Sequence, residues 1–232
     1  MNENIEPLRV RLLITPTEIL KLLPGMGKVM VIGQQGGVTH ERIGPVGTVG
    51  QSGRDMHLGG ACHDAVIAVD AVAEVILDTS SVMRDKVYPR LEFRLADGET
   101  GFAIVGMDGL EPFAAPLVDL DRETLPPREK PEVGERTELD PADPLHPPLQ
   151  QAVDRQDMVR IRFDNGVLRQ DWTGRIEALK PAMGYLNVMT ADFHLHLQGG
   201  AFSGWDARAG HQAALDADGA ATTLTLETMV TA

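Results

Sequence analysis

The sequence has little cysteine, few aromatic residues, few basic residues and no long apolar run. Its single cysteine, Cys62, excludes an intramolecular disulfide and a zinc site built from cysteines alone, and it suits a reducing compartment. No stretch approaches the ~18 apolar residues that a membrane helix needs, and the first residues lack the apolar core of a signal peptide. We therefore expect a soluble cytoplasmic protein that does not insert into a membrane.

Acidic residues outnumber basic residues by 34 to 21, which gives a formal net charge of −13. Such a chain repels a phosphate backbone unless its basic residues gather in one patch, and the sequence shows no such patch. Nucleic acid is therefore not an expected partner. With 232 residues, 43% of them apolar, the chain is long enough for one large domain or two small ones.

Short runs of Val, Ile, Leu and Thr between glycines and prolines predict a strand-rich fold with few helices. The clearest helix follows a capping box made by Thr15 and Glu18. Residues 28–33 and 38–43 predict a hairpin across a Gln-Gln-Gly-Gly turn. The next segment, residues 44–60, contains six glycines, and we expect a long loop there.

Further short apolar runs predict strands in both halves of the chain. They are residues 64–69, 73–78, 90–95, 101–105, 159–163, 167–172, 187–189, 193–197, 202–208 and 221–230.

A change of composition divides the chain. Seven of its 15 prolines lie in residues 126–148, among acidic residues. Because proline removes a backbone donor and acids are costly to bury, we expect a linker there. It separates residues 1–125 from residues 149–232, which repeat the same order of strand, turn and strand. We therefore predict an α+β fold of two tandem repeats of antiparallel sheet, related by a pseudo-twofold duplication.

Two histidines, His194 and His196, stand two residues apart in a predicted strand. Residues i and i+2 share one face of a strand, so both imidazoles could reach one metal ion. The simpler interpretation is that this face is polar while the opposite face is buried. It is favoured because no third ligand lies close in the sequence.

Other constellations carry less information. His57, Cys62 and His63 offer nitrogen and sulfur ligands, but a structural zinc site usually has four ligands at closer spacing. The glycines at residues 33–37 are not followed by the Lys-Ser or Lys-Thr of a phosphate loop. No Gly-x-Ser-x-Gly motif supports a hydrolase. The residues alone therefore assign no reaction.

Several segments, taken in order, resemble motifs of the HemS/ChuS/ChuX group of bacterial heme-utilisation proteins. Residues 23–30 (LPGMGKVM) and 40–44 (HERIG) are similar to LP-x-x-GEVM and VHE(K/R)xG in that group. Residues 185–189 (YLNVM) and 192–197 (DFHLHL) resemble WLNVLDPDFNLHL. Weaker matches keep the same order at residues 90–98, 165–174 and 218–227. The matches extend over roughly two-thirds of the chain.

The resemblance implies a duplicated α+β fold with large antiparallel sheets and a cleft for heme, used in carriage or, in some members, in degradation. His40 stands at the histidine of VHE and is the first candidate iron ligand, with a surface residue that supports the turn as the alternative. His196 stands at the histidine of FNLHL, where a structural role is the simpler interpretation. Arg42 and Arg208 could bind the heme propionates, because the forked donors of arginine suit carboxylates, and the simpler interpretation is that both are ordinary surface arginines.

Three positions depart from the group's pattern. A helix with a DVHxF histidine, which supplies an iron ligand in full-length members, is replaced here by the proline-rich segment. The histidine of that segment, His146, lies in the string PLHPP, which we expect not to form that helix. Trp172 stands in place of the group's HTG histidine. Residues 100–104 (TGFAI) lack the histidine and lysine of the group's AVHKVYL motif.

Two main hypotheses follow. The leading one is a cytoplasmic heme-binding protein of the heme-utilisation type, with heme as its cofactor and partner, acting as a monomer or homodimer. The alternative is the same fold after loss of heme ligation, serving as a non-heme small-molecule or protein interaction module. A third reading is an oxidative heme-degrading enzyme, which the sequence does not separate from a carrier because open iron coordination cannot be read from it.

Overall fold

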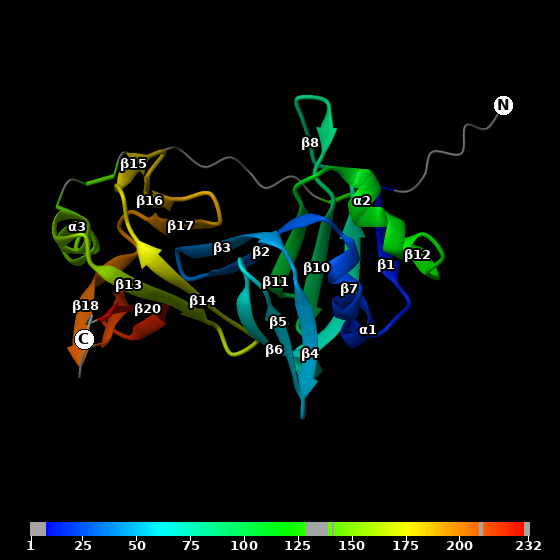
Figure 1. Ribbon diagram of the computed structural model, residues 1–232, viewed down its shortest axis with the longest axis horizontal. Helices are drawn as coiled ribbons and strands as arrows, with labels where there is room; N and C mark the ends of the chain where they lie inside the picture. Colours follow the sequence, from blue (N-terminus) through cyan, green and yellow to red (C-terminus); the bar gives the residue numbers. More distant parts are fainter. Residues whose placement is uncertain (1–7, 129–138, 141, 209–210, 230–232) are drawn as a thin grey trace.

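The computed structural model describes residues 8–128, 139–140, 142–208 and 211–229 of the chain (Figure 1). They form two large antiparallel sheets of ten and eight strands, with a separate two-stranded ribbon. Short helices lie at the periphery of these sheets. The predicted strand-rich α+β class with antiparallel sheets is confirmed.

The ten-stranded sheet begins at an edge strand from the first half and ends at one from the second half. Its order is β12 (Arg122–Thr124), β1 (Arg9–Leu12), β7 (Val72–Asp78), β10 (Arg90–Leu95), β11 (Thr100–Gly106), β2 (Lys28–Gln35), β3 (Val38–Pro45), β17 (Phe193–Gln198), β16 (Tyr185–Met189) and β15 (Lys180–Ala182).

The eight-stranded sheet also combines strands of both halves. Its order is β18 (Phe202–Arg208), β19 (His211–Asp216), β20 (Ala221–Met229), β13 (Met158–Asp164), β14 (Leu168–Arg175), β6 (Asp64–Ala68), β5 (Asp55–Gly59) and β4 (Thr48–Ser52). The ribbon pairs β8 (Val82–Met83) with β9 (Lys86–Val87).

The helices of the described residues are short. They are α1 (Pro16–Lys21), α2 (Leu110–Ala114) and α3 (His146–Arg155), with 3-10 turns at Leu23–Gly25, Val69–Ala71 and Ala115–Leu117. The predicted capping box of α1 is present, since Thr15 and Glu18 each bond to the other's backbone nitrogen. None of the described helices is long and apolar enough to cross a membrane.

The strand orders show how the duplication is built. The order β7-β10-β11-β2-β3 in one sheet matches β18-β19-β20-β13-β14 in the other. Three strands of each half join the sheet of the other half. Strands β17, β16 and β15 of the second half extend the ten-stranded sheet beyond β3, and strands β6, β5 and β4 of the first half extend the eight-stranded sheet beyond β14. The matching orders are those that a pseudo-twofold duplication would give, in agreement with the predicted architecture. Figure 1 shows β3 and β17, from opposite halves, side by side.

The two halves meet through a mirrored pair of side chains. His40 on β3 donates from Nε2 to the carbonyl oxygen of Ile161 on β13, at 3.3 Å. Gln170 on β14 donates to the carbonyl oxygen of Val31 on β2, at 3.4 Å. His40 and Gln170 therefore occupy equivalent positions in the two halves.

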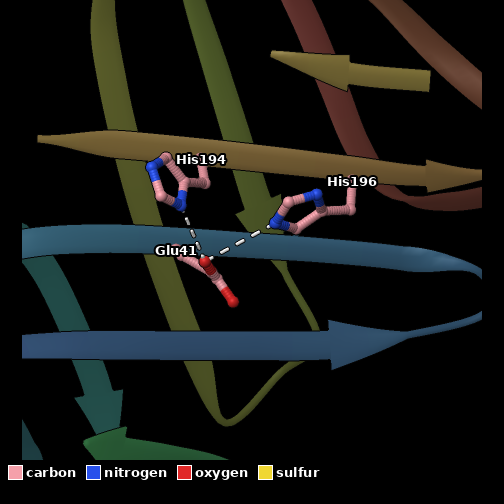
Figure 2. Close-up of side chains that lie close together, drawn as sticks. All are labelled: Glu41, His194 and His196. Atoms are coloured by element: carbon pink, nitrogen blue, oxygen red, sulfur yellow. Dashed lines mark hydrogen bonds and ion pairs between the residues drawn. The ribbon is translucent and has the colours of Figure 1, made fainter. Parts of the chain in front are cut away.

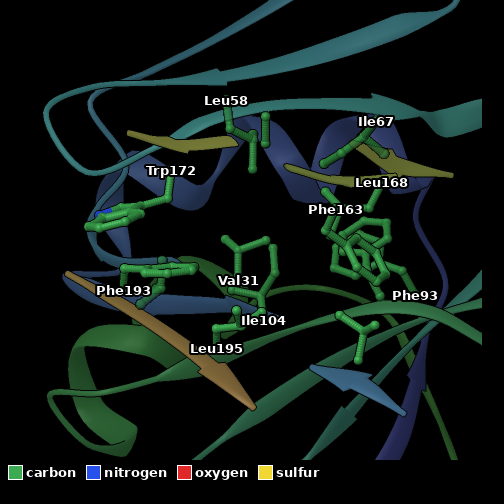
Figure 3. Packing of buried hydrophobic residues seen from close by; sticks show 14 of the residues in the cluster. Val31, Leu58, Ile67, Phe93, Ile104, Phe163, Leu168, Trp172, Phe193 and Leu195 are labelled. Atoms are coloured by element: carbon green, nitrogen blue, oxygen red, sulfur yellow. The ribbon is translucent and has the colours of Figure 1, made fainter. Parts of the chain in front are cut away.

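One apolar core fills the space between the sheets (Figure 3). Trp172 of the eight-stranded sheet stacks on Phe193 of the ten-stranded sheet, with ring centroids 4.5 Å apart. Phe163 lies over Gly33, where an added Cβ would come within 2.4 Å of the ring. The glycine thus lets the ring of one sheet approach the backbone of the other.

The predicted loop at residues 44–60 is wrong, because this segment contains β4 and β5. Gly50 in β4 and Gly59 in β5 have no positive φ and accept strand geometry. Gly53, with φ of 62°, makes the turn between the two strands. A glycine-rich strand is tolerated here because β4 lies at the edge of its sheet.

The PLHPP string was expected, because of its prolines, not to form the helix of the group's DVHxF motif, yet a helix, α3, begins at His146. Pro147 and Pro148 fall in its first turn, where the missing N–H groups would have no partner in the helix anyway. Of the predicted linker at residues 126–148, residues 129–138 and 141 lie outside the described residues. The proposed domain limits stay predictions, and each sheet contains strands of both halves.

Candidate functional site

Alternation along β3 and β17 separates two chemically different faces. Phe193, Leu195 and Leu197 of β17 are buried in the core, whereas His194 and His196 point away from it. On β3, His40 is buried and its neighbour Glu41 lies on the outward face. Successive strand residues face opposite sides of a sheet, which explains the division.

The outward face brings Glu41, His194 and His196 together (Figure 2). Glu41 Oε2 lies 3.3 Å from His194 Nδ1 and 3.6 Å from His196 Nε2. The two imidazoles stand edge to face, with ring centroids 6.0 Å apart. Their side chains are 22% and 27% exposed, so solvent reaches the cluster.

Asn187 on β16 fixes the orientation of the second imidazole. Its Oδ1 lies 2.6 Å from His196 Nδ1 and therefore accepts the ring N–H. Its amide nitrogen donates to the carbonyl oxygens of Lys180 at 2.7 Å and Tyr185 at 3.1 Å. With Nδ1 committed as a donor to Asn187, Nε2 is the ring atom that faces Glu41.

The Glu41 carboxyl group is strongly acidic. Burial by itself raises its pKa, but the hydrogen bonds from His194 and His196 outweigh burial and lower the pKa to about 2. Glu41 is therefore an anion at any pH near neutrality.

His40, the iron ligand expected from the sequence, is fully buried. Its Nε2 bonds the Ile161 carbonyl, and its Nδ1 lies 2.9 Å from Gln170 Nε2, which donates to it. Phe163 and Phe193 pack near the ring. Burial lowers the pKa of His40 to about 3. The hydrogen bond to Ile161 acts in the opposite direction, and the charge of nearby Arg42 lowers the pKa as well. Both ring nitrogens are thus in use.

The two arginines expected at the propionates are placed differently. Arg42 is 5% exposed, and its Nε and Nη2 donate to the carbonyl oxygen of Cys62 at 2.9 and 2.6 Å. It also lies 3.4 Å from the Asp192 carboxylate. Arg208 is the last residue of β18, and its side chain lies outside the described part of the chain. The structure does not bring Arg42 to the imidazole cluster.

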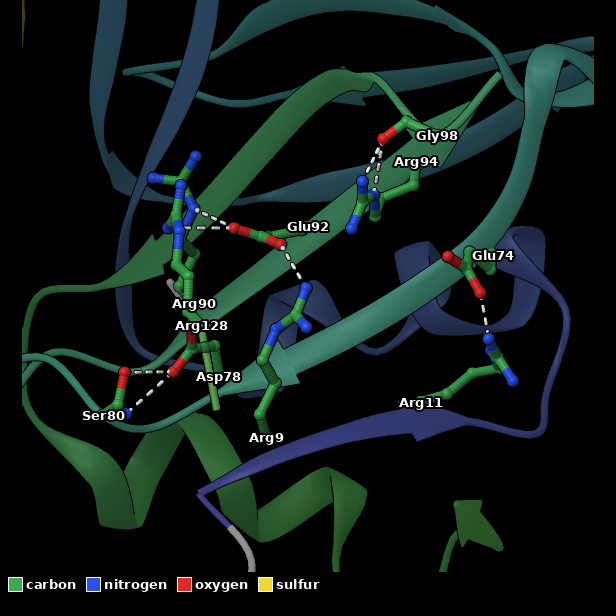
Figure 4. Close-up of polar contacts among 10 residues, drawn as sticks. All are labelled: Arg9, Arg11, Glu74, Asp78, Ser80, Arg90, Glu92, Arg94, Gly98 and Arg128. Carbon is green, nitrogen blue, oxygen red and sulfur yellow. Dashed lines mark hydrogen bonds and ion pairs between the residues drawn. The ribbon is translucent and has the colours of Figure 1, made fainter. Parts of the chain in front are cut away.

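A second polar group lies on the same sheet (Figure 4). Arg9, Arg90 and Arg128 surround the buried carboxylate of Glu92, at 3.5, 3.3 and 3.1 Å. A cavity of about 280 Å³ adjoins this group. It is lined by Ile32, Gln34, Arg90, Glu99, Thr100, Phe102, Ala103 and Arg128.

The cavity and the cluster are connected along one row of the sheet. Glu41 pairs with Ile32, Ile32 with Ala103 and Ala103 with Glu92, on β3, β2, β11 and β10. Directly paired residues share a face, and neighbouring strands lie ~4.8 Å apart, so the row spans about 14 Å. Imidazoles thus stand at one end of this row of paired residues, and arginines stand at the other.

The remaining histidine candidates are dispersed. His57 is exposed on β5, and His63 is buried with its Nε2 bonded to the carbonyl oxygen of Gly44 at 2.9 Å. Among the residues that the structure describes, they do not form a ligand cluster with Cys62. His146 lies at the start of α3.

Sequence reasoning found His194 and His196 but missed their third partner, Glu41. The missing ligand is far away in the chain and reaches the histidines through the pairing of β3 with β17. Residues 40–44 and 192–197 both resemble motifs of the group, but the motifs do not indicate that the two segments form neighbouring strands. Arg90 and Arg128 were missed for the same reason.

The fold has counterparts among solved structures. It aligns with ChuS, an E. coli heme oxygenase, over 97% of this chain and 84% of that chain, with a TM-score of 0.75 and 16% identity. It aligns with holo-PhuS, a heme-binding protein from Pseudomonas aeruginosa, over 97% and 82%, with a TM-score of 0.70 and 16% identity. Neither protein-family models nor curated protein sequences give a match. The fold that the sequence resemblance implied is therefore confirmed.

Proposed function

We propose that this chain is a cytoplasmic heme-binding protein of the heme-utilisation type, acting in heme carriage. The observation that carries the proposal is the ChuS-like fold over nearly the whole chain, combined with two accessible imidazoles on one face of its larger sheet. A heme site needs an axial ligand, cations for the propionates and apolar surface. Each requirement can be compared with the residues on this face.

The imidazoles supply the axial ligand. His196 is the first candidate, because Asn187 holds its Nδ1–H and leaves Nε2 as the ligating atom. His194 is the second. Heme bound there supplies an iron centre whose absorption spectrum reports the axial ligand.

The arginines at the other end of the row suit the propionates. Arg90 and Arg128 line the cavity of about 280 Å³, and the apolar residues Ile32 and Ala103, which follow Glu41 in the row of paired residues, line it too. Forked guanidinium donors bind carboxylates in two-pronged geometry. The residues of this face therefore fit the group, with Arg90 and Arg128 in the role that the sequence gave to Arg42 and Arg208.

Ligation by His40 stays a prediction with a defined physical requirement. Its ring would have to give up its contacts with Ile161 and Gln170 and leave the core. Each buried group left without its hydrogen bond costs about 1–3 kcal/mol. This requirement favours His196 over His40 as the iron ligand.

The alternative function is a ChuS-like fold that binds a different small molecule or a protein. One observation favours it: Trp172, which replaces a histidine of the family motif, is stacked on Phe193 inside the core. That position offers packing in place of a ligand.

A hemin titration followed at the Soret band separates these functions. We expect a saturating 1:1 shift in the wild type that His194→Ala/His196→Ala abolishes and that His57→Ala, an exposed strand histidine, leaves intact. His40→Gln should also leave it intact. No saturable shift in the wild type would favour the alternative function. A shift lost in His40→Gln and kept in the double variant would assign the iron to His40.

A further inference from the structure

The cluster of Glu41, His194 and His196 has the spacing of a metal site. Its three candidate ligand atoms all lie within 4.8 Å of one another. Ligands bound at about 2.0–2.2 Å around a tetrahedral ion lie roughly 3.4 Å apart. The two distances from Glu41 Oε2, 3.3 and 3.6 Å, already match that value. A small rotation of the rings would complete the third edge.

The contacts behind the cluster are those of a metal ligand. Metal-bound histidines almost always donate their other ring N–H to an oxygen that fixes the ring. His196 does so to Asn187 Oδ1 at 2.6 Å. Asn187 is in turn fixed by backbone carbonyls of β15 and β16, so the position of His196 Nε2 is set by the sheet.

The donor set selects the class of ion. Two imidazoles and one carboxylate suit Zn²⁺, Fe²⁺, Co²⁺ or Ni²⁺, whereas Mg²⁺ and Ca²⁺ prefer oxygen ligands alone. Three protein ligands leave at least one coordination position free. The partial exposure of both imidazoles leaves the cluster accessible to solvent.

The other half of the molecule shows that the fold alone does not produce this set. Asp171, which follows Gln170, is the counterpart of Glu41, and Asp64 and Val66 on β6 stand where β17 has His194 and His196. Asp171 is already bound by Arg162. Asp171 is therefore a carboxylate at the position equivalent to Glu41 that has no imidazoles opposite it.

We infer that Glu41, His194 and His196 bind a divalent transition-metal ion directly, without a porphyrin. The free coordination position makes it an open site that can accept water or a small anionic ligand. This inference goes beyond the proposed heme function and does not depend on it, because it concerns the bare ion.

The test uses the full chain after removal of metals with a chelator, in the absence of heme. Co²⁺ is added while the visible absorption is followed, and Zn²⁺ is then added in competition. We expect one equivalent of Co²⁺ per chain, displaced by Zn²⁺, with binding at least tenfold weaker in both Glu41→Gln and His196→Ala. Asp171→Asn and His57→Ala should bind like the wild type.

Three results would overturn the inference. They are no uptake by the wild type, uptake that Glu41→Gln and His196→Ala leave unchanged, and a loss as large in Asp171→Asn as in Glu41→Gln. Circular dichroism of each variant checks that the fold is kept. Because heme is absent throughout, a failed hemin titration leaves the metal result unaffected, and a failed metal titration leaves the heme result unaffected.

Discussion

The outward faces of the two repeats carry the same carboxylate position in different surroundings. On β3, Glu41 faces two imidazoles at 3.3 and 3.6 Å. On β14, Asp171 is bound by both prongs of Arg162, with Nε and Nη2 each donating to one carboxylate oxygen at 2.7 Å. Asp171 is thus paired with a fixed cation, whereas Glu41 faces two imidazoles, which are groups that can ligate a metal ion.

The difference comes from the residues beside each carboxylate. In the first half, Glu41 pairs with Ile32 on the neighbouring strand of its hairpin. In the second half, Asp171 pairs at the same place with Arg162. Without a neighbouring guanidinium, Glu41 is left to the histidines that β17 contributes. The duplicated backbone therefore fixes where a carboxylate stands, and the neighbouring strand decides what it can bind. For this reason a ChuS-like fold does not by itself carry a ligand set.

The largest expected effect tests whether the two faces of β17 are independent. Phe193→Ala removes a buried ring that stacks on Trp172, and we expect a loss of about 3–5 kcal/mol in the free energy of unfolding. His194→Ala, one residue along, should lower it by about 1 kcal/mol or less, because it loses only a partly exposed contact with Glu41. Urea denaturation measures both. Similar losses in the two variants would show that the outward imidazole is part of the structural core.

A smaller effect tests the equivalent pair His40 and Gln170. The pKa of His40 is 6.5 in the unfolded chain and about 3 in the fold, so between these values the unfolded chain binds one more proton. Stability should therefore be full above pH 6.5 and fall on acidification, by about 2 kcal/mol from pH 7 to pH 5. His40→Gln, which copies the residue of the other half, should remove that part of the pH dependence.

The difference between the wild type and His40→Gln in how the free energy of unfolding depends on pH reports the contribution of His40. The lowered pKa of buried His63 acts with the same sign in both proteins and cancels. Glu41, whose low pKa adds stability that is lost only below its ordinary value of 4.5, lies outside the window. Equal slopes in the wild type and His40→Gln would mean that His40 is accessible to protons in the fold.

Much of the fold was predictable because its signals are local. The capping box at Thr15 and the alternation in residues 193–197 depend on neighbours in the chain, and both are present as expected. The repeat was visible as a recurring order of strands. Strands β4 and β5 were missed because glycine supplies no side chain from which a pattern can be read. Helix α3 does not follow from the rule that proline breaks helices, because Pro147 and Pro148 occupy its first turn, where proline is tolerated.

The site was less predictable because it depends on which strands become neighbours. The exchange of three strands between the repeats places β17 beside β3, and no local pattern specifies that pairing. His194 and His196 could be placed on one face from their spacing alone, but Glu41 could not be added to them. Likewise, the burial of His40 depends on Ile161 and Gln170, which lie in the other half.

The smallest expected effect compares the two carboxylates directly, in metal-free protein at pH 7.5. Asp171→Asn breaks a two-pronged pair and should lower the free energy of unfolding by roughly 1 kcal/mol. Glu41→Gln should lower it by no more than that, because the imidazoles beside Glu41 are partly exposed and the side-chain amide keeps a hydrogen bond to one of them. A loss at Glu41 clearly larger than at Asp171 would identify the histidine cluster as a structural ion pair, held by donation from the imidazoles to Glu41, instead of a set of ligands for an ion.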